Sequence, residues 1–409
     1  MVKENLQVED VDVGSALDSL LAIAVVAALA PLLLGLVPRL RVPQVVLLLA
    51  GGIVIGPQVL GLASPVSVQA LADLGLGFVF LLAGYEIDQR LYRQDAGRRA
   101  LLAWFVALAL GLGVTGILAA TGFVDAFVAV ALALTTTALG TLVPVLRENG
   151  MLRGRLGGHL LANGAMGELL PILAIAVFLG ISSRFVALAS LGAVVVLAVL
   201  LSLAARTMRP GGRMAGILRD HQHETSQITL RLTVLLLVLL LAVTERFHLD
   251  AVLGAFVAGM VLRRWAGRSA PALEEKLDVA GHGFLIPIFF VYSGMTIDLH
   301  AIASAPVRVF VFFGLMLLVR GMPALLIYLG VLAARERVQT MLVSATALPL
   351  VVALTTIGLR NGTMLPENAA ALVGAAVLTV LVFPTLAVML NRPAPEGTTP
   401  DASPRHPAV

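Results

Sequence analysis

The stretch Asn163-Gly164-Ala165-Met166-Gly167-Glu168-Leu169-Leu170-Pro171 puts a carboxyl group near the middle of an apolar run, residues 156–181, that is long enough to cross a lipid bilayer. No other Asp, Glu, Lys or Arg occurs between Arg155 and Arg184. A charge at membrane depth is costly, so it usually lines a polar cavity and takes part in moving ions or protons. Glu168 is therefore the best single guide to this chain.

The composition of the whole chain indicates a polytopic membrane protein. Hydrophobic residues make up 59% of the chain and charged residues 13%, with a mean hydropathy of +0.98, which lies outside the range of soluble domains. The absence of cysteine excludes disulfides, thiol catalysis and cysteine-ligated metals. The net charge of +4 does not indicate nucleic-acid binding, because the arginines cluster in short loops between apolar runs. The lack of a Walker A motif argues against an ATP-driven pump.

Thirteen apolar runs approach or exceed the length of about 17 residues that crosses a bilayer, and they predict an all-α fold. We expect residues 1–14 to be an extracytoplasmic tail, 15–390 the transmembrane domain and 391–409 a disordered cytoplasmic tail. The runs cover residues 15–37, 43–62, 66–85, 99–120, 124–145, 157–181, 184–206, 227–245, 249–264, 280–297, 306–330, 336–359 and 364–390.

The loops between these runs alternate sharply in basic content. One set of loops holds most of the arginines, whereas the opposite set holds only Lys3, Arg184, Arg246, Arg308 and Arg360. By the positive-inside rule, the N-terminus is expected outside and the C-terminus in the cytoplasm of a multi-pass cell-membrane protein. This orientation requires an odd number of membrane helices, which agrees with thirteen.

A weak internal repeat suggests that the second half of the chain is an inverted copy of the first. The segments Phe80-Leu-Leu-Ala-Gly84-Tyr-Glu-Ile87-Asp88 and Phe290-Val-Tyr-Ser-Gly294-Met-Thr-Ile297-Asp298 share the pattern F-x-x-x-G-x-x-I-D. In the preceding runs, Leu49-Ala50-Gly51 loosely matches Val257-Ala258-Gly259. The offset is seven helices, an odd number, so the copies have opposite orientations. Inverted repeats are typical of secondary transporters, whose binding site lies at the midplane.

Glu168 and Arg320 are the two charges that the sequence places deepest in the membrane. Desolvation favours the neutral form of a carboxyl, and a carboxylate that binds either a proton or an alkali cation couples the two directly. Arg320 needs a partner, and Glu168 is the obvious acid. The pair could be a fixed structural bridge, or Glu168 could release Arg320 when an ion binds. Because Arg keeps its proton at physiological pH, it can compete as a charge but is a poor proton donor.

Two apolar runs, the fifth and the twelfth, are interrupted by proline and hydroxyl residues. Proline removes a backbone hydrogen bond, so unwound carbonyls and hydroxyls can face a cavity. These runs are seven apart, so they are candidates for two broken helices around a midplane site. The acids Asp73, Glu86, Asp88 and Asp298 look like structural residues near helix ends. The interrupting residues are Thr135, Thr136, Thr137 and Pro144 in the fifth run, and Ser344, Thr346, Pro349, Thr355 and Thr356 in the twelfth.

Several segments together resemble the monovalent cation:proton antiporter-2 family. The resemblance implies a dimer of thirteen-helix subunits, with crossed broken helices at positions five and twelve and an elevator-like movement of a core domain. It places the ion-binding carboxylate on Glu168, its basic partner on Arg320 and the polar break on Thr135 to Thr137. We add Asn163 to the ion-binding candidates. The similar segments are residues 42–61, 74–88, 253–259, 287–298 and 378–384.

The chain departs from this family at two positions. The family carboxylate is usually an Asp preceded by Asp, Asn or Gln, whereas Gly167 precedes a Glu in this chain. One acid instead of two favours a single charge-binding site and electroneutral exchange. The segment Ala347-Leu348-Pro349-Leu350 replaces the Gly-Glu-Phe of many potassium-efflux relatives, which weakens the case for efflux of the glutathione-gated type.

The leading interpretation is a secondary antiporter that exchanges Na⁺ or K⁺ for H⁺ at Glu168. The expected partners are these ions, the bilayer and a second copy of the chain, with any regulatory subunit on a separate chain. We expect no enzymatic activity, no cofactor, no nucleic acid and no metal beyond the transported alkali cation. The alternatives are a sensor, or a symporter of an organic anion held by Arg320.

Overall fold

The computed structural model describes residues 13–36, 43–86, 95–178, 228–246, 251–266, 270–304, 306–360 and 362–391, and every regular element in these ranges is a helix. Eight helical runs among these residues are long and apolar enough to cross a membrane. The expected seventh run, 184–206, and the tails before residue 13 and after residue 391 lie outside the described residues. Each of the other twelve runs falls on a helix or an interrupted helix.

The helices in the first half of the chain are α1 (Val13–Leu36), α2 (Gln44–Ile55), α3 (Pro65–Glu86), α4 (Asp95–Ala120), α5 (Phe127–Leu134), α6 (Leu139–Glu148) and α7 (Gly154–Phe178). The second half contains α10 (Ile228–Arg246), α11 (Ala251–Ala266), α12 (Ala270–Ala280), η3 (Gly281–Leu285), α13 (Ile286–Met295), α14 (Leu299–Ser304), α15 (Pro306–Met316), η4 (Leu317–Gly321), α16 (Met322–Ile327), α17 (Ala334–Ser344), α18 (Pro349–Arg360) and α19 (Pro366–Met389).

The tenth run is longer than its hydropathy indicates. The apolar pattern begins at residue 280, but the helix begins at Ala270 and continues through the π-helical turn η3 into α13. Its first turns carry the exposed acids Glu274 and Glu275. A hydropathy pattern marks only the part of a helix that avoids water, so it cannot locate a polar extension.

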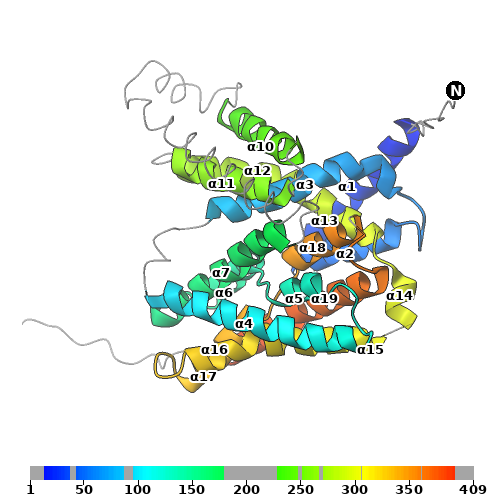
Figure 1. The fold of residues 1–409 in the computed structure, drawn as a ribbon. Helices are drawn as coiled ribbons and strands as arrows, with labels where there is room; N and C mark the ends of the chain where they lie inside the picture. The colour runs from blue at the N-terminus through cyan, green and yellow to red at the C-terminus, as the bar shows by residue number, and fades with distance from the viewer. Residues whose placement is uncertain are drawn as a thin grey trace, which may run out of the picture.

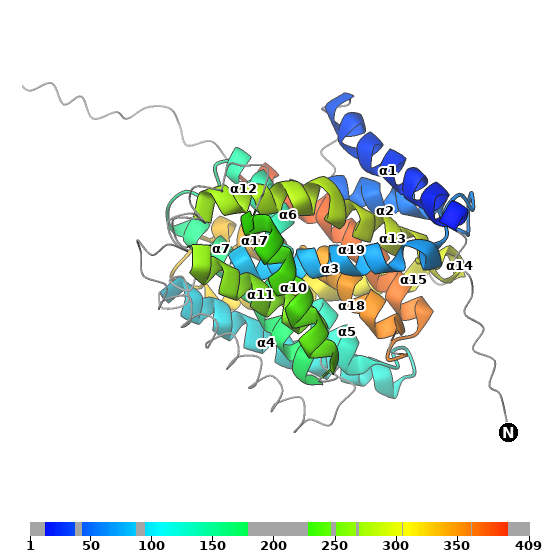
Figure 2. The same ribbon diagram turned by 90° about the horizontal axis from the view of Figure 1, so that it is seen from above.

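The helices form two bundles. The scaffold bundle consists of α1–α3 and α10–α13, in which α3 packs on α11 and α2 packs on α13. The site bundle consists of α4–α7 and α15–α19, in which α4 packs on α7 and α19 packs on α15, α17 and α18. Figure 1 shows α3, α10 and α11 in the upper part of the molecule and α4, α15 and α17 in the lower part. Seen from above, α10 lies across α3 and α11, and α1 lies at one edge beside α2 (Figure 2).

Glycines from the repeated segments make the closest helix contacts of the scaffold bundle. A Cβ on Gly84 of α3 would meet the Phe256 carbonyl oxygen at 2.1 Å, and one on Gly259 of α11 would meet the Leu81 oxygen at 2.0 Å. The same arrangement recurs between α2 and α13, where Gly294 faces the backbone of Leu49 and Gly52 faces the carbonyl of Val291. The counterpart of Gly259 is therefore Gly52, and not Gly51 as the sequence match predicts, because Gly51 faces Val26 of α1. Small residues let membrane helices approach closely. The first repeat's α3 and α2 therefore contact the second repeat's α11 and α13 in equivalent ways, as inverted repeats require.

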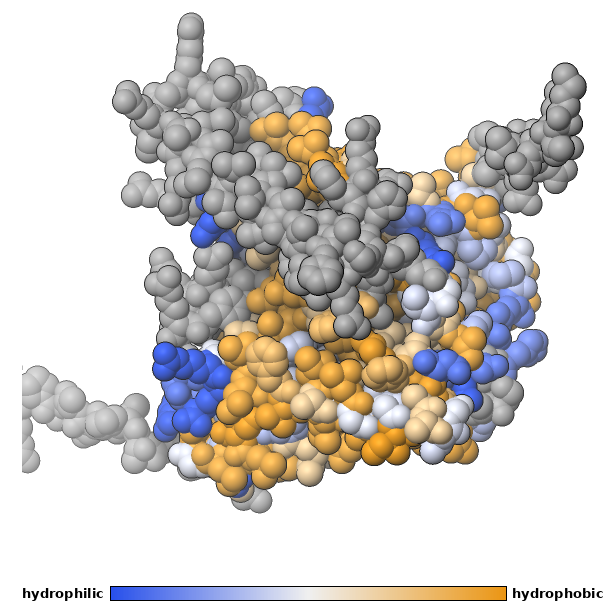
Figure 3. All heavy atoms as spheres, in the orientation of Figure 1, coloured by the Kyte–Doolittle hydropathy of each residue, from blue (hydrophilic) through white to orange (hydrophobic). Residues whose placement is uncertain are grey.

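The molecular surface has the apolar character of a membrane protein. Apolar residues cover the middle of the face in Figure 3, and hydrophilic residues gather toward its left and right edges. Many large apolar side chains are exposed, among them Leu21 of α1, Leu235 of α10 and Phe310 of α15. Exposed apolar surface of this extent suits a lipid environment. The expected all-α membrane fold is confirmed.

Candidate functional site

The two interrupted helices cross at their breaks. α5 ends at Leu134 and α6 begins at Leu139, while α17 ends at Ser344 and α18 begins at Pro349. The Ala138 N–H donates to the Thr346 carbonyl oxygen over 2.8 Å. The expected pair of crossed discontinuous helices is therefore present, and backbone groups of one break satisfy those of the other.

Threonines, not Pro144, end α5. The hydroxyls of Thr135 and Thr136 donate to the carbonyl oxygens of Leu132 and Ala133, each over 2.8 Å. Hydroxyls that bond to the preceding turn compete with the helical ladder. Pro349 begins α18, where a missing N–H costs nothing. Pro144, expected to mark the break in the fifth run, instead lies inside α6, and the interruption precedes it.

A proline in α7 frees a backbone group for the site. Pro171 has no N–H, so it cannot bond to the carbonyl of Gly167 four residues earlier. That carbonyl oxygen accepts a hydrogen bond of 2.9 Å from the N–H of Thr137. The break between α5 and α6 is thus attached to α7 beside Glu168.

The carboxyl group of Glu168, a residue of α7, lies at the N-terminus of α6. The Glu168 side chain is partly buried, and its Oε1 accepts a hydrogen bond of 3.3 Å from the backbone N–H of Gly140, the second residue of α6. The unpaired N–H groups and the dipole at a helix N-terminus favour a negative charge. This position stabilises the ionised carboxylate against the cost of burial.

A cavity of about 990 Å³ lies between the two bundles and reaches Glu168. The site bundle contributes Thr137, Ala138 and Gly140 from the first break, and Pro349 and Leu350 from the start of α18. The scaffold bundle contributes apolar residues of α2, α3 and α13, including Val45, Phe80 and Phe290. The cavity extends to residues near the arginine-rich loops, namely Gln44, Asn149, His282 and Val388.

Arg320 is buried beside this site, with 1% of its surface exposed. It lies on the π-helical turn η4, a distortion that is frequent at functional sites. Its Nε donates to the Thr137 hydroxyl over 3.0 Å, and its Nη2 donates to the Asn163 carbonyl oxygen over 2.6 Å and to the Asn163 Oδ1 over 3.2 Å. Arg320 therefore links α7 to the first break. Its pairing with Glu168 stays a prediction.

Asn163 connects Arg320 to the second break. Its Nδ2 donates to the hydroxyl of Ser344, and its side chain is buried. The Thr137 hydroxyl, which accepts from Arg320, itself donates to the Ser344 carbonyl oxygen over 2.7 Å. The sequence places Ser344 among the polar residues of the twelfth run, but nothing in that pattern distinguishes it as a site residue. Because Ser344 lies at the end of α17, it accepts hydrogen bonds from both Asn163 and Thr137.

Gly167 makes room for Arg320. A Cβ at this position would lie 2.3 Å from the Thr137 Oγ1 and 2.7 Å from the Arg320 Nη2. Contacts this short do not occur between real atoms, so any side chain would displace the arginine or the threonine. The glycine before the acid, which distinguishes this chain from the family pattern, therefore leaves space for Arg320 in the position that the structure gives it.

Comparison with protein families gives a match over nearly the whole chain. Residues 24–390 match the family described as sodium/hydrogen exchanger, transmembrane. The chain belongs to this family. The chain also resembles a solved structure, that of the sodium proton antiporter MjNhaP1 from Methanocaldococcus jannaschii, with a TM-score of 0.68 and 18% identity over 92% of this chain and 98% of that one. At that identity the likeness shows the fold.

Several relatives of the chain have antiporter names. It is 28% identical over 301 residues to the putative Na⁺/H⁺ antiporter YjbQ of Bacillus subtilis, covering 69% of this chain and 47% of the relative. It is 30% identical to the Na⁺/H⁺ antiporter NhaS5 of Synechocystis, covering 64% and 37%, and 25% identical to the probable Na⁺/H⁺ antiporter 3 of Methanocaldococcus jannaschii, covering 66% and 69%. The chain thus matches about half or less of the length of the first two of these relatives.

The predicted site residues lie together but differ in position relative to the cavity. Glu168 and Thr137 line it. Thr135, Thr136 and Asn163 are buried behind it, with side chains engaged by their own helix, Arg320 or Ser344. Within the described residues, no group of three or more His, Cys, Asp and Glu side chains could hold a resident metal ion.

Proposed function

We propose that this chain exchanges a monovalent cation, Na⁺ or K⁺, for protons across the cell membrane. The observation that carries the proposal is the place of Glu168, which lines a cavity of about 990 Å³ at the crossing of two interrupted helices. A single carboxylate holds either a proton or a cation, so binding of one ion releases the other. Family membership and the antiporter names of the relatives support this reading.

The cation ligands are the Glu168 carboxylate and the carbonyl oxygen of Gly140. Pro144 has no N–H, so it cannot form the α-helical bond to the Gly140 carbonyl four residues earlier. Gly140 lines the cavity that Glu168 also lines. Unwound or released carbonyls are the groups with which transporters coordinate alkali cations. Pro144 thereby acquires a role in the site even though it does not break the helix.

Asn163 and Arg320 position the site and do not bind the cation. Both side chains are buried, and their hydrogen bonds join α7 to the two breaks. The same burial disfavours symport of an organic anion by Arg320, because two of its nitrogens are already engaged by Thr137 and Asn163. The proposal also includes a homodimer in the bilayer, with the N-terminus outside and the C-terminus in the cytoplasm.

The decisive experiment uses purified protein in vesicles with an imposed pH gradient. Addition of Na⁺ or K⁺ should dissipate the gradient in the wild-type protein, and Glu168→Gln should abolish this response because an amide cannot exchange a proton for a cation. The matched control is Glu275→Gln on the exposed face of α12, which should exchange like the wild type. Normal exchange by Glu168→Gln would disprove the shared-carboxylate mechanism.

A further inference from the structure

An arginine joins the two bundles at the end of their interface that lies away from the cavity. Arg360, the last residue of α18, forms an ion pair with Asp73 of α3. Its Nη2 also donates to the Tyr292 hydroxyl of α13 over 3.2 Å, and the guanidinium lies 5.6 Å from the centre of the Tyr292 ring. Arg360 belongs to the site bundle, and both partners belong to the scaffold bundle.

A small space lined by hydroxyl groups lies between α13, α18 and α19, and its lining includes Leu359, the residue before Arg360. It has a volume of about 30 Å³, which is room for a single water molecule. Its lining includes Ser293, the neighbour of Tyr292 in the chain, and Thr356, one helical turn before Arg360. Each hydroxyl donates to a carbonyl of its own helix, at Phe289 and Val352. Their oxygen lone pairs therefore remain available as acceptors. Thr296, Thr355 and Asp298 complete the polar part of the lining.

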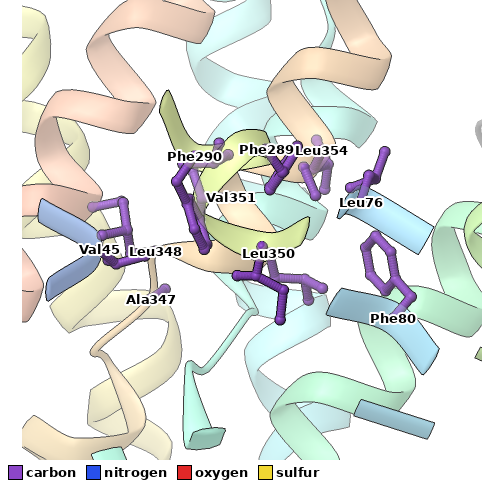
Figure 4. Packing of buried hydrophobic residues seen from close by; sticks show 14 of the residues in the cluster. Val45, Leu76, Phe80, Phe289, Phe290, Ala347, Leu348, Leu350, Val351 and Leu354 are labelled. Atoms are coloured by element: carbon purple, nitrogen blue, oxygen red, sulfur yellow. The ribbon is translucent and has the colours of Figure 1, made fainter. Parts of the chain in front are cut away.

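An apolar contact separates this space from the cavity. Figure 4 shows Phe289 and Phe290 of α13 close to Val351 and Leu354 of α18. These side chains belong to one buried cluster. Along the interface between α13 and α18, the cavity at Glu168 is therefore followed by this apolar contact and then by the hydroxyl-lined space.

We propose that the hydroxyl-lined space is the closed outer half of the cation pathway and that Arg360, with Asp73 and Tyr292, is its gate. This inference rests on the proposed exchange, which requires Glu168 to face each side of the membrane in turn. Exposure to the far side requires α18 to separate from α3 and α13, and this movement breaks the contacts of Arg360. The freed hydroxyl oxygens then replace water around an alkali cation, and the partly exposed ion pair is weak enough to open in each cycle.

Cross-linking tests the gate, because the natural chain has no cysteine. In an Asp73→Cys/Arg360→Cys variant, the two introduced thiols are the only ones in the protein. A short bis-methanethiosulfonate reagent is used because an arginine–aspartate pair spans more distance than a disulfide. The cross-link should stop exchange in vesicles, and a reducing agent should restore it. Undiminished exchange by the cross-linked protein would rule out this gate.

The matched control is a second ion pair of the same kind that lies within one bundle. Arg308 of α15 and Glu367 of α19 are 3.3 Å apart, and both helices belong to the site bundle. Cross-linking of Arg308→Cys/Glu367→Cys should therefore leave exchange intact. A wild-type protein that exchanges neither Na⁺ nor K⁺ would contradict the proposed function, whereas equal behaviour of the two cross-linked variants would contradict only the gate.

Thiol accessibility tests the pathway without relying on a cross-link. Thr356→Cys, read with an impermeant thiol reagent on the side away from the cavity, should react slowly in the gated protein. Combination with Arg360→Ala should raise the rate by up to about fivefold, the shift in equilibrium that a partly exposed ion pair can supply. Equal rates in the two backgrounds would overturn the assignment of this space to the pathway.

Discussion

At the scale of single residues, the site depends on where backbone groups are released or blocked. Pro171 leaves the Gly167 carbonyl free for Thr137, and Pro144 leaves the Gly140 carbonyl without its helical partner. Gly167 lets Arg320 lie against the backbone of α7. Neither glycine carries chemistry of its own, so a search for functional side chains passes over both.

Substitution of Gly167 tests the close packing at the site, and substitution of another glycine of α7 controls for the effect of helix propensity. Gly167→Ala introduces a Cβ that overlaps Thr137 and Arg320, and we expect it to lower the free energy of unfolding by about 1–3 kcal/mol. Gly158→Ala on the same helix is the control. It meets no atom within 4 Å and should gain up to about 1 kcal/mol from helix propensity. Denaturation in detergent measures both, and a Gly167→Ala protein as stable as Gly158→Ala would refute the close contact.

Substitution of Pro144 tests the Gly140 carbonyl as a cation ligand. Pro144→Ala supplies an N–H that can bond to this carbonyl and withdraw it from the cation. We expect the KM for the cation to rise several-fold because one ligand is lost, while the maximal rate of exchange changes less. Pro31→Ala in α1, a proline inside a helix that is not part of the cavity lining, is the control for a restored helical bond. An unchanged KM in Pro144→Ala would remove Gly140 from the proposed ligands.

At the scale of helices, crossings of close backbones hold the scaffold bundle together. The repeated pattern predicts that residues 80–88 and 290–298 are equivalent, but it does not predict which helices their glycines face. The structure pairs Gly84 with α11 and Gly294 with α2. A helix–helix contact of this kind depends on two surfaces that lie far apart in the sequence, so no local pattern identifies the partner.

The crossing of α2 and α13 should be sensitive to a single methyl group. A Cβ at Gly294 would lie 2.2 Å from the Leu49 carbonyl oxygen, and backbone atoms cannot move aside as a flexible side chain can. We expect Gly294→Ala to lower the thermal unfolding temperature in detergent. Gly314→Ala on exposed α15, with no atom within 4 Å, should leave that temperature unchanged or slightly raised. Equal unfolding temperatures for the two variants would show that the helices do not approach this closely.

At the scale of the whole molecule, the cavity opens on one side of the interface and the Arg360 contact closes the other. The cavity reaches Asn149, Gln44 and Val388, which border the arginine-rich loops. The positive-inside rule assigns these loops to the cytoplasm, so the described conformation would face inward.

Single cysteines can test this orientation because the natural chain has none. An impermeant thiol reagent added to intact cells should label Thr363→Cys, which follows α18 on the side of Arg360. It should label Arg153→Cys, in the loop before α7, only after the membrane is permeabilised. Both residues are exposed in the structure. The reverse labelling pattern would place the N-terminus in the cytoplasm and contradict the predicted topology.

The sequence alone determined the membrane class, the positions of the twelve apolar runs that the structure describes and the two interrupted helices. It also predicted Glu168 as the central acid. It could do so because hydropathy, charge and proline content are properties of each segment by itself. Only the tertiary structure decided that Arg320 binds Asn163 and Thr137, residues 157 and 183 positions away, and that a side chain at Gly167 would displace one of these partners. The physical reason is that these contacts form where separate helices pack together, and the sequence of one helix does not determine how it packs on another.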